Sequence, residues 1–163
     1  MKKIGLLSDT HSHLGEDVLK HLQGCDEIWH AGDFGNSAIA EKLQELAPLR
    51  GVFGNIDGNY IRSQFPENLF FELEQAKILM RHISGTPPKY NPECRKLLTE
   101  LKPNLLVCGH SHILRIQYDG EKNCLFMNPG AAGKQGWHKV RTLVRFIVDG
   151  KDFRDCKVVE LPR

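Results

Sequence analysis

The sequence predicts an α/β fold, and three observations support this class. Short apolar runs of strand length alternate with segments whose apolar residues recur at helical spacing, as in successive βα units. Polar side chains follow directly on several of these strands, which is where open α/β sheets place their sites. The last third alternates apolar and polar residues around Asp-Gly pairs at 119–120 and 149–150, so antiparallel strands are expected there.

Length and composition fit one globular domain spanning residues 1–163, which is 40% hydrophobic and 26% charged. The net charge of +2 comes from 22 basic and 20 acidic residues without a basic run, so charge argues neither for nor against nucleic acid. The five cysteines form no Cys-x-x-Cys motif and are expected to be reduced thiols in a cytoplasmic protein. No export signal is evident, and no apolar stretch approaches the length of a membrane span.

Each expected element follows from its local pattern. Glu16 and Asp17 suit the first turn of a helix, and Asn91 followed by Pro92 is typical of a helix start. The expected order is strand 4–7, a helix from Leu14 to Gly24, strand 27–31, a helix from Asn36 to Pro48, strand 49–53, strands 69–73 and 77–81, a loop over 84–90, a helix from Asn91 to Pro103, strand 104–108, and strands near 114–118, 125–127, 144–148 and 156–161.

Seven polar side chains stand at the ends of the expected strands. They are Asp9, His11, Asp33, Asn55, His82, His110 and His112. An Asp-x-His pair alone is weak evidence because aspartate is common in turns, but here the arrangement recurs along the chain. His110 and His112 are two residues apart, and on extended chain both rings would face one cavity.

The donor types indicate a catalytic metal site. Two carboxylates, one amide and four imidazoles without a thiolate argue against structural zinc and favour manganese, iron, nickel or catalytic zinc. Seven ligands are too many for one ion. Two ions that share a bridging aspartate use such a set, and paired metals are the usual device for in-line displacement at phosphorus.

Taken in order, these motifs resemble the signature of the calcineurin-like metallophosphoesterases. The motifs are Asp9-x-His11, Gly32-Asp33, Gly54-Asn55, His82 and Gly109-His110-x-His112. Their spacing is most similar to the small bacterial and archaeal phosphodiesterase branch, and the similarity runs from residue 3 to about residue 148. The resemblance implies a four-layer α/β/β/α sandwich, with two mixed sheets between helices and the site on loops at one edge.

The resemblance also implies roles for these residues. Asp9, His11 and His112 would hold one ion, and Asn55, His82 and His110 the other, with Asp33 bridging. The family reaction is hydrolysis of phosphate esters by a hydroxide that bridges the two ions. We therefore predict a manganese-dependent phosphodiesterase of small phosphodiesters or nucleotides, with Asp33 and Asn55 taking part in catalysis and iron, nickel or zinc as other candidate ions.

Two positions depart from the family pattern. Ile56 stands where many members have a histidine assigned to leaving-group protonation, although the small phosphodiesterase branch often lacks it too. Asp57 is the nearest replacement proton donor, and its simpler interpretation is a turn aspartate. After His82, the family commonly shows His-Gly-His, whereas this chain has Ile83 and Ser84.

Loss of proton donation costs on the order of 10²–10⁴ in rate. Substrates whose leaving group needs no proton would therefore be favoured, and we expect aryl phosphodiesters or anhydrides to react better than alkyl monoesters. His13 and Asn36 are candidate substrate-binding residues because they lie close to ligands in the sequence. Four loop residues could close over a phosphoester, although an ordinary surface role is the simpler interpretation for each: Lys89, Tyr90, Lys134 and His138.

Three alternatives stay open. The retromer subunit of eukaryotes is a small relative that keeps the fold as a protein scaffold with a degraded metal site, but every ligand type is intact here. Related nucleases are longer and carry a capping domain, whereas this chain has no clustered basic face. A mononuclear esterase would leave Asn55 and His82 as hydrogen-bonding residues. No membrane or nucleic-acid partner is expected, and a homo-oligomer is left open.

Overall fold

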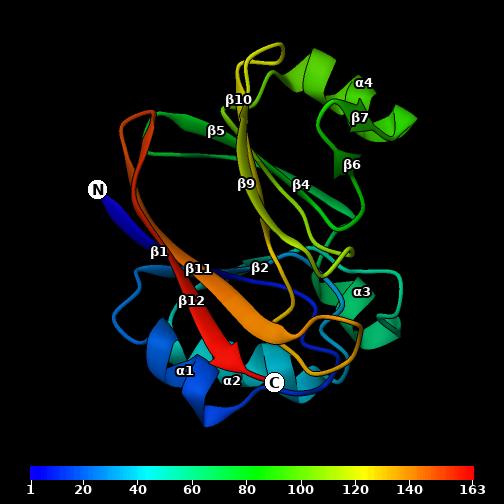
Figure 1. Ribbon diagram of the computed structural model, residues 1–163, viewed down its shortest axis with the longest axis vertical. Helices are drawn as coiled ribbons and strands as arrows, with labels where there is room; N and C mark the ends of the chain where they lie inside the picture. Colours follow the sequence, from blue (N-terminus) through cyan, green and yellow to red (C-terminus); the bar gives the residue numbers. More distant parts are fainter.

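Two five-stranded mixed sheets face each other in the computed structural model, which describes residues 1–163 (Figure 1). The first sheet has the order β12-β11-β1-β2-β3. Its strands are β1 (Lys2–Leu7), β2 (Glu27–His30), β3 (Leu49–Gly51), β11 (Val140–Asp149) and β12 (Asp152–Pro162). The β1, β2 and β3 strands are parallel, and β11 pairs antiparallel with both β1 and β12.

The second sheet has the order β4-β5-β8-β10-β9. Its strands are β4 (Asn68–Leu73), β5 (Ala76–Arg81), β8 (Leu105–Val107), β9 (Leu114–Asp119) and β10 (Cys124–Pro129). The central β5, β8 and β10 strands are parallel, while β4 and β9 pair antiparallel at the two edges. Both sheets are therefore mixed.

Helices cover the outer faces of both sheets. Alternation along the strands divides the core, since Leu105 and Val107 face the first sheet while Leu106 packs under a helix. The α1 (Glu16–Leu22), α2 (Ser37–Leu46) and α3 (Asn59–Gln64) helices pack on the first sheet, and α4 (Pro92–Leu101) packs on the second. The structure confirms the four-layer α/β/β/α sandwich.

Most elements agree with the sequence pattern, and the differences are local. The α3 helix was not predicted, because a six-residue helix with the single buried residue Ile61 shows no periodicity. The loop over 84–90 contains a small hairpin of β6 (Gly85–Thr86) and β7 (Lys89–Tyr90). Asn91 caps α4 by accepting from the Cys94 N–H at 2.8 Å, whereas the Asn36 side chain makes no cap hydrogen bond on α2.

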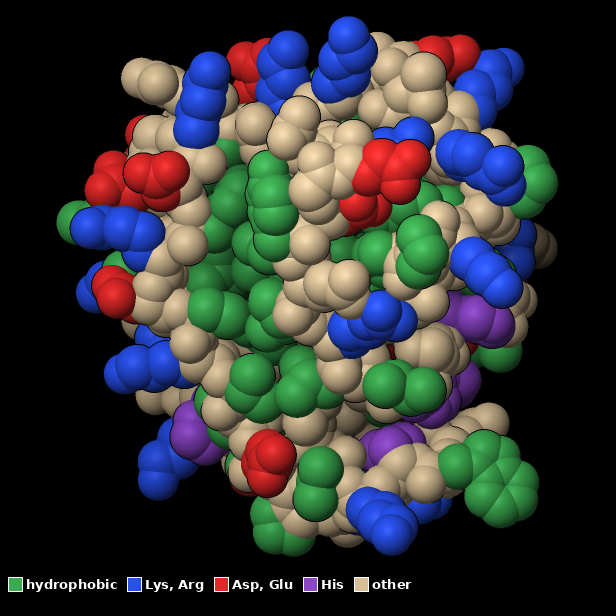
Figure 2. All heavy atoms as spheres, turned by 45° about the horizontal axis from the view of Figure 1, so that its top comes forward, with side chains coloured by type: hydrophobic (Ala, Val, Ile, Leu, Met, Phe, Trp, Pro, Cys, Tyr) green, Lys and Arg blue, Asp and Glu red, His purple; other side chains and the backbone are tan.

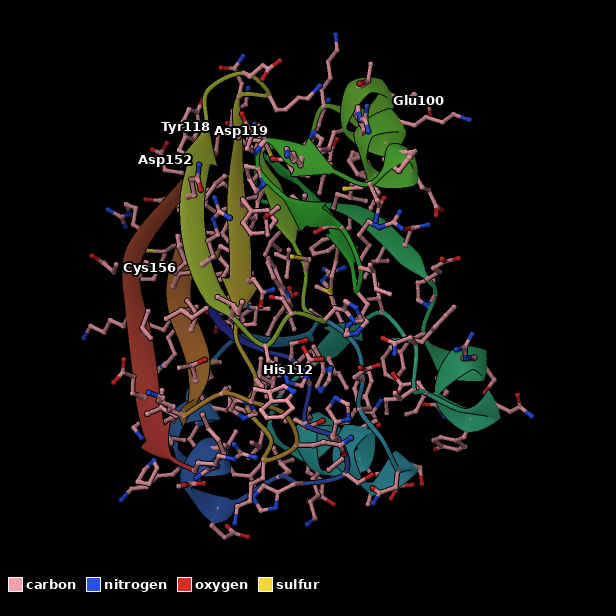
Figure 3. The ribbon with its side chains drawn as sticks, turned by 45° about the vertical axis from the view of Figure 1, so that its right-hand side comes forward. Glu100, His112, Tyr118, Asp119, Asp152 and Cys156 are labelled. Atoms are coloured by element: carbon pink, nitrogen blue, oxygen red, sulfur yellow. The ribbon has the colours of Figure 1, made fainter.

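Parallel strands bring the sequence motifs to one region. The chain leaves β1, β2 and β3 of the first sheet and β5 and β8 of the second just before the polar motifs, and parallel neighbours end at the same edge. His112 lies in this loop region, far from Tyr118 at the other end of β9 (Figure 3). All five cysteines are unpaired. None of the helices has the length and apolar character needed to cross a membrane.

Candidate metal centre

The loops that carry the candidate ligands have unusual backbone conformations. Asp9, His11, Asp33, His110 and His112 all have positive φ, between 45° and 74°. Non-glycine residues rarely adopt this left-handed region, and such strain gathers at functional sites. The expectation of extended chain between His110 and His112 is wrong. The left-handed turn instead sends the two rings to two different groups of ligands.

Asp9 is the most buried of the candidate ligands. Its Oδ2 accepts hydrogen bonds from Ser8 Oγ at 2.6 Å and from the His110 N–H at 3.0 Å. Its Oδ1 has no hydrogen-bond partner and lies 3.2 Å from His112 Nε2 and 3.8 Å from His11 Nε2. Burial raises the Asp9 pKa, but His11 and His112 outweigh it and hold the pKa below its usual range.

Asp33 lies between histidines from different loops. Its Oδ1 accepts the Ile56 N–H at 3.0 Å, while its Oδ2 lies 3.4 Å from His11 Nε2 and 3.1 Å from His82 Nε2. His82 Nδ1 is 2.7 Å from the Ala31 carbonyl oxygen, which can only accept, so Nδ1 carries the proton. In the neutral ring the lone pair is then on Nε2, which faces Asp33.

The candidate ligands form two adjacent groups. Within each group, the donor atoms all lie within 4.8 Å of one another. The groups are Asp9, His11 and His112, and Asp33, His82 and His110. Asn55 joins the second group through its Oδ1, which lies 3.1 Å from His110 Nδ1. The structure thus brings together all seven residues that the sequence singled out.

The motif glycines allow these close approaches. A Cβ atom at Gly54 would lie 2.0 Å from Asp33 Oδ1. A Cβ atom at Gly109 would lie 2.1 Å from Ser8 Oγ and 2.7 Å from Asp9 Oδ2. Any larger residue at either position would displace one of the two carboxylates, which explains the Gly-Asn and Gly-His pairs in the sequence.

The residues fit divalent metal ions. Asp9 Oδ1, His11 Nε2 and His82 Nε2 are buried without a hydrogen-bond partner. Buried polar atoms are almost always satisfied, so three unsatisfied atoms that converge on one place need an explanation. A cation satisfies lone pairs of this kind, and carboxylate with imidazole suits manganese, iron or zinc.

A family model for the calcineurin-like phosphoesterase superfamily domain matches residues 1–151 of this sequence. The chain belongs to this superfamily. With the family shown and the donor set fitting metal ions, this member is a metal-dependent phosphoesterase.

One curated relative agrees with this assignment, and two solved structures share the fold. A probable metallophosphoesterase of Methanothermobacter thermautotrophicus is 32% identical over 133 residues, covering 78% of this chain and 76% of that protein. An archaeal phosphodiesterase has a TM-score of 0.77 at 19% identity, covering 98% of this chain and 99% of its own. Vps29 of Entamoeba histolytica, in complex with zinc, has a TM-score of 0.75 at 17% identity, with 97% and 98% covered. The two structural likenesses show the fold alone.

Within this phosphoesterase, Asp57 has a different task from the proton donation predicted for it. The side chain is buried, and its Oδ2 accepts the N–H groups of Asp33 at 3.0 Å and Gly54 at 2.8 Å. Its Oδ1 accepts the Gly35 N–H at 2.9 Å. Both oxygens are thus occupied within the backbone. The prediction that Asp57 donates a proton is therefore corrected. Its hydrogen bonds instead connect the loop that carries Asp33 to the loop that carries Asn55.

The candidate substrate-binding residues, His13 and Asn36, lie on the loops that carry His11 and Asp33. The His13 N–H donates to Thr10 O, and the Asn36 N–H donates to Ser12 Oγ. Neither side chain hydrogen-bonds to any of the seven clustered residues, so substrate binding by His13 and Asn36 stays a prediction.

The four loop residues that could close over a phosphoester lie in two different places. Tyr90 is buried and donates to Asp119 Oδ2 at 2.6 Å, and Lys89 lines a hollow with it, so both belong to another part of the surface. His138 does reach the centre, because its ring packs edge-on against His112 at a centroid distance of 5.4 Å. Lys134 is exposed on the same loop as His138.

His30 is a supporting residue that the sequence analysis missed. It is fully buried at the end of β2, where Nδ1 accepts the Gly32 N–H at 3.1 Å and Nε2 lies 3.0 Å from Thr10 Oγ1. Thr10 Oγ1 in turn donates to Phe34 O at 2.9 Å. Burial lowers the His30 pKa to about 3, so the ring is neutral and links the loops after β1 and β2.

We expect Asp57→Ala to reduce the free energy of unfolding by about 3 kcal/mol, because it leaves three backbone N–H groups without their charged acceptor. Metal affinity should fall about 10–100-fold, as for other residues that orient ligands. Urea unfolding and metal titration measure both effects. Asp152→Ala, at an exposed aspartate, is the matched control and should change stability by less than about 0.5 kcal/mol. Unchanged stability with lost activity would restore the proton-donor role.

We expect His30 to make stability fall in acid. Its pKa is about 3 when folded, against an ordinary value near 6.5, so the unfolded chain takes up a proton that the folded chain does not. Stability is therefore full above about pH 6.5 and is lost as the pH falls toward 3, by about 2 kcal/mol at pH 5. Urea unfolding of chelator-treated protein at pH 7 and pH 5 should show a smaller loss for His30→Gln than for wild type. Equal losses would contradict the assignment.

Proposed function

We propose that this phosphoesterase is a phosphodiesterase that hydrolyses small phosphodiesters with two divalent ions, manganese being the first candidate. The observation that carries the proposal is the position of Asp33 Oδ2, 3.4 Å from His11 Nε2 in one group and 3.1 Å from His82 Nε2 in the other. A carboxylate oxygen placed between two groups of ligands suits a bridge between two ions. The donor types suit manganese, with iron, nickel and zinc as alternatives.

In this proposal each group of ligands holds one ion. Asp9, His11 and His112 take the first, and Asn55, His82 and His110 the second, with Asp33 shared. Two ions held there would activate a water molecule as the nucleophile and neutralise charge on the phosphate.

The protein's own contribution is to fix the donors before substrate arrives. Ser8 and the His110 N–H hold one oxygen of Asp9, so the other faces the centre. The Ile56 N–H does the same for Asp33, and the Ala31 carbonyl fixes the tautomer of His82. Pre-positioned ligands of this kind need no rearrangement during the reaction.

The leaving group sets the substrate preference. Ile56 offers no proton, and both oxygens of Asp57 are occupied by backbone N–H groups. A substrate whose leaving group departs as a stable anion therefore has the advantage, so the proposal favours aryl phosphodiesters and anhydrides over alkyl monoesters. The sequence shows none of the clustered basic residues that tracking a nucleic-acid backbone needs, so the proposal favours small substrates, in a cytoplasmic enzyme.

We expect hydrolysis of bis(4-nitrophenyl) phosphate by chelator-treated protein to require added manganese. Asp33→Asn and His82→Ala should each lower kcat/KM by more than about 100-fold, because each removes a direct ligand rather than a supporting group. An alkyl monoester should react on the order of 10²–10⁴ more slowly than the aryl diester.

Asp152→Asn and His21→Ala are matched controls for these variants, since they remove the same residue types away from the centre. Both should keep wild-type activity. Activity without metal, or full activity in Asp33→Asn, would contradict the proposal, and equal rates for alkyl monoester and aryl diester would contradict the leaving-group argument.

A further inference from the structure

Trp137 is the most exposed large apolar side chain in the molecule. It is 99% exposed, while the other tryptophan, Trp29, is fully buried between the sheets. Trp137 lies on the loop between β10 and β11, two residues from Gln135 and directly before His138. Leaving an indole ring fully exposed to water costs free energy. A ligand that covered the ring would recover this free energy, so we ask how close Trp137 lies to the metal centre.

One hydrogen bond joins the Trp137 loop to the metal centre, and a second closes the loop on itself. The Gly133 N–H donates to Asp9 O at 3.1 Å, and His138 Nε2 lies 2.7 Å from Gly133 O. At Gly136, a Cβ atom would lie 2.3 Å from His112 Nδ1, so the backbone there touches the ring of that candidate ligand. Trp137 follows Gly136 by one peptide unit, about 3.8 Å between Cα atoms. The backbone of Trp137 is therefore anchored beside the centre, and its indole ring is free in solvent to meet a ligand.

Three further exposed apolar side chains directly follow candidate ligands. Ile56 follows Asn55, Ile83 follows His82 and Ile113 follows His112, with exposed fractions of 46%, 39% and 66%. We call these three isoleucines and Trp137 the apolar rim. Figure 2 shows histidine side chains at the right of this face with apolar side chains beside them.

We propose that the apolar rim binds a planar aromatic group carried by the phosphoester, with Trp137 stacking on its face. This inference rests on the proposed function and names the substrate class of the same site: phosphoesters that carry an aryl group or a nucleobase. Stacking on an exposed aromatic side chain is worth about 1–3 kcal/mol per base, or roughly 5- to 150-fold in affinity.

The surroundings favour a small aromatic ligand over a protein partner. Of the four rim residues, Ile83 alone lines a cavity of about 370 Å³, together with Asn55 and His82, and this size is within the range of small-molecule pockets. The rim residues adjoin polar candidate ligands in the chain, so apolar and polar groups alternate there, as is usual in a ligand site rather than in a continuous apolar interface. Lys134, exposed on the Trp137 loop, supplies a positive charge suited to a phosphate.

Binding of two phosphonates to the manganese-loaded protein tests this inference without turnover. Phenylphosphonate and methylphosphonate share the anionic group and differ in the ring, and their carbon–phosphorus bonds are not esters. We expect phenylphosphonate to bind about tenfold more tightly, as measured by calorimetry. It should also quench tryptophan emission, and because Trp29 is buried the change should disappear in Trp137→Phe.

Variants of Trp137 distinguish loss of stacking from a general loss of ligand binding. Trp137→Ala should reduce the affinity ratio to within about twofold, while Trp137→Phe should keep most of it because phenylalanine also stacks. Tyr118→Ala removes another exposed aromatic ring, 60% exposed and far from His112, and should leave the ratio unchanged. Thymidine 5′-monophosphate is a second test ligand. If its affinity falls in Trp137→Ala, the ring that binds is a nucleobase. If only the affinity for phenylphosphonate falls in Trp137→Ala, the ring belongs to an aryl ester.

Equal affinities for the two phosphonates, with manganese-dependent diesterase activity intact, would overturn the aromatic-ring proposal and leave the proposed function in place. A protein partner would then be the remaining occupant of the rim. A ratio unchanged in Trp137→Ala would also overturn it. Absence of binding by either phosphonate, together with absence of activity, would overturn the proposed function and this inference with it.

Discussion

The burial of two carboxylates among histidines is the constraint on which the rest of the structure depends. Asp9 and Asp33 are almost inaccessible, and Asp9 Oδ1 has no hydrogen-bond partner although imidazole nitrogens lie 3.2 and 3.8 Å away. The neighbouring histidines hold the Asp9 pKa low, so this carboxylate stays ionised, and a buried charged oxygen without a partner is expensive unless a cation binds there. The left-handed backbone, the motif glycines and the Asp57 contacts all maintain this arrangement, which suits metal binding better than it suits the stability of the empty protein.

The fold and the cluster of ligands were predictable from the sequence because both follow from local rules. Alternation along strands such as Leu105–Val107 sets which side chain faces which layer, and parallel strands deliver the following residues to one edge. A site built in this way keeps its residues directly after strands, so Asp9, Asp33 and His82 stand out even when each motif alone is weak. The order of five motifs then pointed to the superfamily that the family match shows.

The features that were not predictable depend on contacts between distant loops. Asp57 looks like a turn residue in the sequence, and only the fold shows that it accepts N–H groups from Gly35 and Asp33, more than twenty residues away. His30 is hidden for the same reason, since its partner Thr10 is twenty residues away. The Trp137 loop has no periodic pattern, so the sequence offered Lys134 and His138 only as loop residues that could close over a phosphoester, and the contact of His138 with His112 is visible only in the fold.

We propose that two ions share Asp33. Anomalous diffraction from crystals soaked in manganese tests this proposal most directly. Data collected on both sides of the manganese absorption edge should show two peaks, one beside Asp9, His11 and His112 and the other beside Asn55, His82 and His110. The peaks should lie about 3.5–4 Å apart with Asp33 between them. A single peak at full occupancy beside either group would contradict the two-ion account and support a mononuclear esterase.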